Sequence, residues 1–162
     1  MVDTVSKNGT FVLNVPGKPD GTIDRKEKAV IDGITAWMEA NGEAIYATRP
    51  WKVSGEGPNM IKAGSFQGDS IRKLGAKDIR FTRSKDAKTV YAIALGWPEG
   101  EFVIGSLGAA AQTAPGRILA VELLGTGRAV EWTQNDDGLH VTLPKEYRPV
   151  ADYAAALRVR LG

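Results

Sequence analysis

The residues of types suited to catalysis do not form a recognisable catalytic pattern. His140 is the single histidine, and it falls on the polar side of an alternating stretch, which favours a half-exposed surface residue over a general base or ligand. No strained nucleophile turn accompanies it, so a Ser–His–Asp triad is not indicated. Asp136 and Asp137 lack the alternating oxygen-ligand spacing of a calcium loop, and a polar hairpin turn is the better interpretation.

Acidic residues are frequent enough to provide the two catalytic carboxyl groups of a glycosidase, which must lie about 5 to 9.5 Å apart. Candidate pairs are Asp20 with Asp24 and Glu43 with Glu56. Spacing along the chain does not establish separation in space, so none of them is assigned a catalytic role. The sequence has no cysteine, which excludes disulfides, thiolate chemistry and cysteine zinc sites; no cofactor or metal is expected.

Two of the four tryptophans are candidates for contact with a sugar. Trp51 lies in a stretch without a regular pattern, and Trp97 precedes Pro98 at the end of a predicted strand. An indole exposed at either place would offer an apolar face to the C–H face of a sugar ring. For Trp51 the favoured alternative is packing that pins this connection to the first part of the chain. Trp37 and Trp132 lie on apolar faces and are expected in the core.

Length and composition indicate an ordinary folded protein. The 162 residues suffice for one domain, or a small domain with an appendage, and they are 43% hydrophobic and 25% charged. The net charge of +2 gives no argument for nucleic acid or a membrane surface. No run approaches the roughly 18 apolar residues needed to span a bilayer, and Met1–Thr4 does not resemble a signal peptide. The chain is expected to be soluble, and the sequence leaves open whether the parent enzyme is secreted or periplasmic.

The first part of the sequence predicts one strand followed by one helix. Residues 10–15 form a β-favouring run that is apolar on both faces, as in a covered parallel strand. A helix is predicted from Asp24, with Glu27 at the capping-box spacing, to Asn41-Gly42, where glycine would form a left-handed cap. Its apolar stripe comprises Val30, Ile34, Trp37 and Met38. A single strand–helix unit cannot make an α/β layer, so we expect the chain to be the end of something larger.

The second part of the sequence predicts an antiparallel β-sandwich. From about residue 78 the apolar residues recur with a period of two, and turn signals follow every 8 to 12 residues. The expected strands, about seven in number, are 79–82, 89–95, 102–107, 119–123, 130–133, 139–143 and 153–160. A boundary near residue 63, within a Gly- and Ser-rich connection, divides the chain into a strand–helix unit (1–63) and a sandwich domain (64–162).

Several stretches resemble the α-L-fucosidases of glycoside hydrolase family 29. The end of that family's catalytic domain is similar to Ser6-Lys7-Asn8-Gly9, Leu13-Asn14-Val15-Pro16, Pro19-Asp20-Gly21-Thr22-Ile23 and residues 37–51. Its C-terminal β-sandwich is similar to residues 78–82, 92–98 and 121–125. The resemblance covers nearly the whole chain, and the blocks in the first part are the more specific.

The resemblance implies a catalytic (β/α)8 barrel that hydrolyses α-L-fucosides with retention, through a carboxylate nucleophile and a second carboxyl as acid/base. This chain matches only the last strand and helix of that barrel and the sandwich. The nucleophile has no counterpart here, so the chain alone is expected to be inactive and no catalytic residue is assigned. Asn14 would sit at the rim where barrel active sites lie, which makes it the candidate pocket-lining residue.

The expected partner is a fucosylated glycan, bound by the full-length enzyme. The alternative function is a stand-alone carbohydrate-binding or structural β-sandwich, for which Trp51 and Trp97 would be the binding residues. A homodimer is a further expectation, because residues 10–15 would carry unpaired strand edges once the rest of a barrel is absent.

Overall fold

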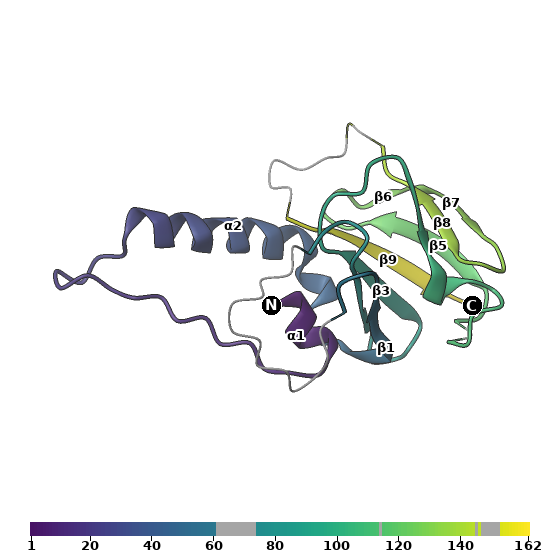
Figure 1. Cartoon of the computed structure of the whole chain (residues 1–162), viewed down its shortest axis with the longest axis horizontal. Coiled ribbons are helices and arrows are strands. Elements are labelled where there is room, and N and C mark those ends of the chain that lie inside the picture. Colours follow the sequence, from purple (N-terminus) through teal and green to yellow (C-terminus); the bar gives the residue numbers. More distant parts are fainter. Residues whose placement is uncertain (61–73, 114, 145, 147–152) are drawn as a thin grey trace.

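Two antiparallel sheets packed face to face form the body of the computed structural model (Figure 1), which describes residues 1–60, 74–113, 115–144, 146 and 153–162. The six-stranded sheet contains, in spatial order, β1 (Arg49–Glu56), β2 (Ile79–Arg83), β3 (Thr89–Ala94), β9 (Ala155–Leu161), β5 (Ile118–Leu123) and β6 (Arg128–Ala129). The three-stranded sheet contains β4 (Glu101–Ile104), β8 (Leu139–Thr142) and β7 (Glu131–Gln134). The predicted antiparallel β-sandwich is therefore confirmed, with nine strands among the described residues.

Successive side chains of a strand point to opposite faces of its sheet, and one face of each sheet packs against the other sheet. In β3, Val90, Ala92 and Ala94 belong to the core between the sheets, whereas Tyr91 and Ile93 point to the opposite face. That opposite face is also covered, by Trp37 of helix α2 (Arg25–Asn41). Both faces of β3 are thus buried, which explains why residues 89–95 are apolar almost throughout.

Helix α2 begins where the sequence predicts. The Asp24 carboxylate accepts a hydrogen bond from the Lys26 backbone N–H at 2.9 Å, which makes Asp24 the N-cap. The predicted left-handed cap at Gly42 is wrong, because its φ is −58°. The chain continues instead into a 3-10 turn, η1 (Gly42–Ala44), so Gly42 keeps a right-handed conformation. No helix of the described residues has the length and apolarity to cross a membrane.

The predicted strand at residues 10–15 is wrong in this structure. A strand needs a hydrogen-bonded neighbour, and here only an isolated bridge between Gly17 and Ile23 forms in this part of the described chain. Residues 9–32, which we call the arm, run away from the sandwich and return as the first half of α2 (Figure 1). Every residue of the arm is exposed or half-buried, and Val30 of the predicted stripe is 53% exposed.

A short helix that the sequence did not predict, α1 (Val2–Ser6), packs against β1 and β2. Its Asp3 carboxylate accepts a hydrogen bond from Nε of Arg80 at 2.5 Å, and Arg80 is fully buried. The Arg80 guanidinium also donates to the backbone oxygens of Ile79, Glu56 and Asn59. One buried cation therefore joins the start of the chain to the edge of the six-stranded sheet.

The predicted boundary near residue 63 lies outside the described residues. β1 precedes it in the chain and pairs with β2, so the sheet of the sandwich already includes Arg49–Glu56. The segment 1–63 thus contributes a strand to the sandwich as well as α1 and α2.

A charged cluster fastens η1 to the outer face of the six-stranded sheet. Glu43 of η1 accepts hydrogen bonds from both Nε and Nη2 of Arg158 in β9 and from the Tyr91 hydroxyl in β3. Arg158 also pairs with Glu122 of β5 at 2.7 Å. Hydrogen bonding to Arg158 lowers the pKa of Glu43, while burial and the bond to Glu43 raise the pKa of Tyr91.

We expect Glu43→Gln to lower the free energy of unfolding by about 1 kcal/mol, because it removes the charge that Arg158 faces across a half-exposed surface. Glu39→Gln is the matched control, since Glu39 is exposed on α2 and the described residues offer it no ion-pair partner. Urea unfolding of the two variants checks this. Equal losses in both would show that the Glu43 contacts contribute nothing specific.

Candidate functional site

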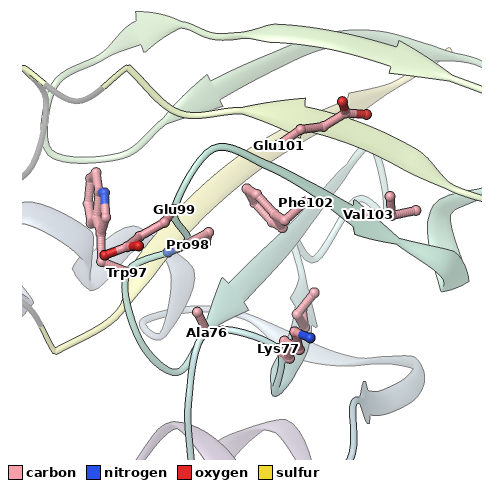
Figure 2. Close-up of a pocket in the computed structure, with 9 residues that line it drawn as sticks. Ala76, Lys77, Trp97, Pro98, Glu99, Glu101, Phe102 and Val103 are labelled. Atoms are coloured by element: carbon pink, nitrogen blue, oxygen red, sulfur yellow. The ribbon is translucent and has the colours of Figure 1, made fainter.

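An open pocket of about 620 Å³ lies beside the loop that joins β3 to β4. Figure 2 shows its lining, which comes from the loop before β2, the first residue of β2, the loop after β3 and the strand β4. The lining residues are Ala76, Lys77, Ile79, Trp97, Pro98, Glu99, Glu101, Phe102 and Val103. We call this the Trp97 pocket. Its volume falls within the usual range of small-molecule sites.

The two loops that form the pocket are held together by Asp78. Its backbone oxygen accepts from the Leu95 N–H, and its carboxylate accepts from Asn59 and from the Gly75 N–H. Burial acts to raise the pKa of Asp78, but these hydrogen bonds outweigh it and lower the pKa. Gly96 allows the close approach, because a Cβ there would lie 2.8 Å from the Ala76 nitrogen. The pocket wall is therefore built on fixed backbone.

The charged side chains of the pocket lining are one lysine, Lys77, and two glutamates, Glu99 and Glu101. Lys77 and Glu99 are exposed, and within the described part of the chain neither has an ion-pair or hydrogen-bond partner. The Glu101 carboxylate points away from Phe102 in Figure 2, and it pairs with Nδ1 of His140 at 2.7 Å. The pocket therefore offers two side chains of opposite charge that the described residues leave unpaired, Lys77 and Glu99, beside the Glu101 carboxylate that His140 pairs.

His140 is the half-exposed surface residue that the sequence predicts. Besides Glu101 it contacts the Asp137 carboxylate at 3.2 Å. Hydrogen bonding to Glu101, with a further contribution from Asp137, raises the pKa of His140. The described residues contain no group of three or more His, Asp or Glu side chains placed to hold a metal ion.

The carboxylates considered as glycosidase pairs have separate structural roles. Glu43 binds Arg158, and Glu56 accepts hydrogen bonds from the backbone N–H groups of Gly105 and Ser106 at 2.9 and 2.7 Å. Asp20 bonds to Thr22 in a turn, and Asp24 caps α2. Each of these four carboxylates therefore has a structural partner of its own. None of these contacts joins Asp20 to Asp24 or Glu43 to Glu56.

The three candidate site residues lie in three different places. Trp51 is in the core, 8% exposed, with its ring centroid 4.9 Å from that of Phe81. Its faces are covered in this structure, so it is not available to stack on a sugar. Asn14 is exposed on the arm and does not line the pocket, whereas Trp97 is half-buried and does. The partners of Trp97 in the pocket were not predicted, although the Pro98–Gly100 turn marked the end of the strand.

Comparison with known proteins identifies the family. The family model described as "Alpha-L-fucosidase C-terminal domain" matches residues 68–160, and the one described as "Alpha-L-fucosidase" matches residues 1–43. The chain belongs to the α-L-fucosidase family. The suspected resemblance is thereby confirmed in both parts of the chain.

Curated relatives and solved structures agree with this assignment. The chain is 32% identical to plasma alpha-L-fucosidase of Rattus norvegicus over 148 residues, which is 90% of the chain and 27% of that relative. It is 33% identical to tissue alpha-L-fucosidase of Bos taurus over 147 residues, 90% of the chain and 26% of the relative. The crystal structure of Thermotoga maritima alpha-fucosidase with a mechanism-based inhibitor matches with a TM-score of 0.72 and 28% identity, covering 98% of the chain and 32% of the structure. The chain thus spans between a quarter and a third of these α-L-fucosidases.

Proposed function

We propose that this chain is the C-terminal part of an α-L-fucosidase and serves the hydrolysis of terminal α-L-fucose from glycans in the assembled enzyme. The observation that carries the proposal is the apolar arm. Phe11, Val12 and Leu13 are 41, 83 and 46% exposed, although they lie in the part that matches the α-L-fucosidase family model. Apolar side chains gathered on one exposed segment mark a surface that another part of the protein covers.

The occupant of that surface is the remainder of the catalytic domain. The curated relative of Rattus norvegicus is more than three times as long as this chain, which covers 27% of it, and most of the arm lies within residues 1–43, which match the α-L-fucosidase family model. Packing against a barrel would supply residues 10–15 with the strand partners that they lack in the described chain. In the assembled enzyme Asn14 would lie at the barrel rim, where it is our candidate for contact with the fucosylated substrate.

We expect the purified 162-residue chain to release no product from an aryl α-L-fucoside. The same chain preceded by the catalytic sequence encoded upstream is expected to release it, because the nucleophile and the acid/base are expected there. Val12→Asp in the joined protein should abolish the activity by placing a charge in the arm contact. Leu119→Asp, at a side chain 56% exposed on β5, is the matched control and should leave the activity unchanged.

Hydrolysis by the 162-residue chain after repurification would contradict the proposal. So would an upstream sequence that encodes no barrel. The competing occupant of the arm is a second copy of the chain, joined through the exposed edge of residues 10–15. Sedimentation distinguishes the two, since a homodimer that Val12→Asp dissociates would support the second copy, and a monomer would exclude it.

A further inference from the structure

We propose that the Trp97 pocket is a binding site for a neutral sugar residue of a glycan, separate from the catalytic site. The ligand would place the C–H face of its ring on the Trp97 indole and its hydroxyls toward Lys77 and Glu99. The choice of fucose as the first ligand to test rests on the proposed function; the pocket geometry calls for a neutral pyranose ring.

The apolar wall of the pocket suits the C–H face of a sugar. Trp97 and Phe102 are half-buried aromatic residues of the lining, Pro98 lines it as a buried residue, and Trp97 is not fully covered by the core on which it packs. Trp97 also lines a second hollow of about 260 Å³, bounded by Leu124 and Ala156 among others. Trp97 thus lines both hollows and is half-buried, whereas Trp51 is buried in the core.

The rim selects the charge of the ligand. An anion would be attracted by Lys77 but repelled by Glu99 and Glu101, whereas a cation would be repelled by Lys77 and would find the Glu101 carboxylate already paired with His140. A neutral molecule with several hydroxyl groups can accept from the Lys77 ammonium and donate to the Glu99 carboxylate at once. The hydrogen-bonding groups of Lys77 and Glu99 are available to a ligand, since the described residues provide neither side chain with a partner. A sugar combines such hydroxyls with an apolar face.

The frame of the pocket is fixed before any ligand arrives. Asp78 ties the loop before β2 to the loop after β3, and Glu56 ties the end of β1 to the backbone that follows β4. A site whose walls are already ordered loses little conformational entropy on binding. The pocket volume of about 620 Å³ has room for one or two sugar rings.

The test is a titration of the 162-residue chain with L-fucose and a fucosylated trisaccharide, followed by saturation-transfer NMR and by tryptophan fluorescence. We expect saturable binding, with magnetisation transferred mainly to the C–H face of one sugar ring. Trp97→Ala should weaken binding about tenfold, and Trp97→Phe should weaken it less because an aromatic face remains. Glu99→Gln and Lys77→Ala should each weaken binding without unfolding the protein.

Two exposed residues away from the pocket provide matched controls. Glu131→Gln, on the three-stranded sheet, and Lys85→Ala, in the turn between β2 and β3, should leave the affinity unchanged. Absence of saturable binding up to tens of millimolar sugar would overturn the proposal, as would binding that Trp97→Ala and Glu99→Gln leave intact. The fucoside hydrolysis assay is unaffected by either outcome, so failure of this inference is distinguishable from failure of the proposed function.

Discussion

Replacing Asp3 with alanine is expected to lower the free energy of unfolding by about 3 kcal/mol, more than half of the stability of a marginal domain. Asp3 is the counter-charge of Arg80, whose side chain is fully buried against α1, β1 and β2. Without the carboxylate the guanidinium keeps its three backbone acceptors and the electrostatic interaction with Asp78, but it loses the one carboxylate to which it donates a hydrogen bond among the described residues. Removing one partner of a buried ion pair costs several times more than a surface ion pair contributes.

A double variant separates this cause from a simple loss of packing. Asp3→Ala combined with Arg80→Met removes both charges and keeps an apolar chain of similar length, so it should be more stable than Asp3→Ala alone. Asp32→Ala is the matched control, since it breaks an exposed pair with Lys28 and should cost less than about 0.5 kcal/mol. Urea unfolding of the three variants checks the prediction. A double variant no more stable than Asp3→Ala would contradict it.

The same ion pair predicts an acid dependence of stability. Burial of the Asp3 carboxyl acts to raise its pKa, but hydrogen bonds from Lys7 and Arg80 outweigh it and hold the pKa below its ordinary value of 3.8. The unfolded chain therefore binds the proton first, and the stabilisation is complete above that value and declines as the pH falls through the lowered pKa. Unfolding measured at a series of pH values should show a smaller acid loss for Asp3→Asn than for the unmodified chain.

Replacing Trp51 with alanine is expected to lower the free energy of unfolding by about 3 to 5 kcal/mol. Trp51 lies between the sheets with Phe81, and their rings are tilted by 57° in the arrangement that aromatic pairs favour. Its removal leaves a cavity that the rigid strands β1 and β2 cannot close. Urea or thermal unfolding measures the loss, and Trp51→Phe should recover part of it.

Trp97→Ala is the comparison for this core substitution. It deletes the same atoms from a half-buried site beside an open pocket, so less apolar surface returns to water and the expected loss is about half. Losses of equal size would mean that Trp97 is a core residue like Trp51 and would weaken the case for it as a binding residue. A loss below about 1 kcal/mol for Trp51→Ala would contradict its place in the core.

The sandwich could be predicted from sequence because its signals are local. Alternation of apolar residues and turn signals placed β2, β3, β5, β7, β8 and β9 within a few residues of their observed bounds. β1 was missed because it contains Pro50 and Gly55, which read as loop signals, and its pairing with β2 shifts register between these two residues. Residues 10–15 have the composition of a strand but no neighbouring strand in the described chain. Composition alone therefore predicted strand pairing that does not form.

The candidate site depended on contacts that sequence spacing does not encode. Trp97 was singled out for its position at a strand end, and it does line a pocket. Lys77 and Phe102, from two other segments, line the same pocket: Asp78 ties the loop that carries Lys77 to Leu95 after β3, and Phe102 comes from β4, which pairs with β8. The burial of Arg80 could not be predicted from sequence either. An arginine that alternates with Ile79 and Phe81 has the pattern of a solvent-facing strand residue.

The position of β9 has a consequence for how the protein is made. The last strand in the sequence lies in the middle of the six-stranded sheet, where it pairs with β3 on one side and β5 on the other. While the ribosome still holds these residues, β3 and β5 have no strand between them, and the sheet exists only as two separate pieces. Deletion of Ala155–Leu161 would therefore remove the centre of the six-stranded sheet, and we expect the product to misfold and to be degraded by proteases.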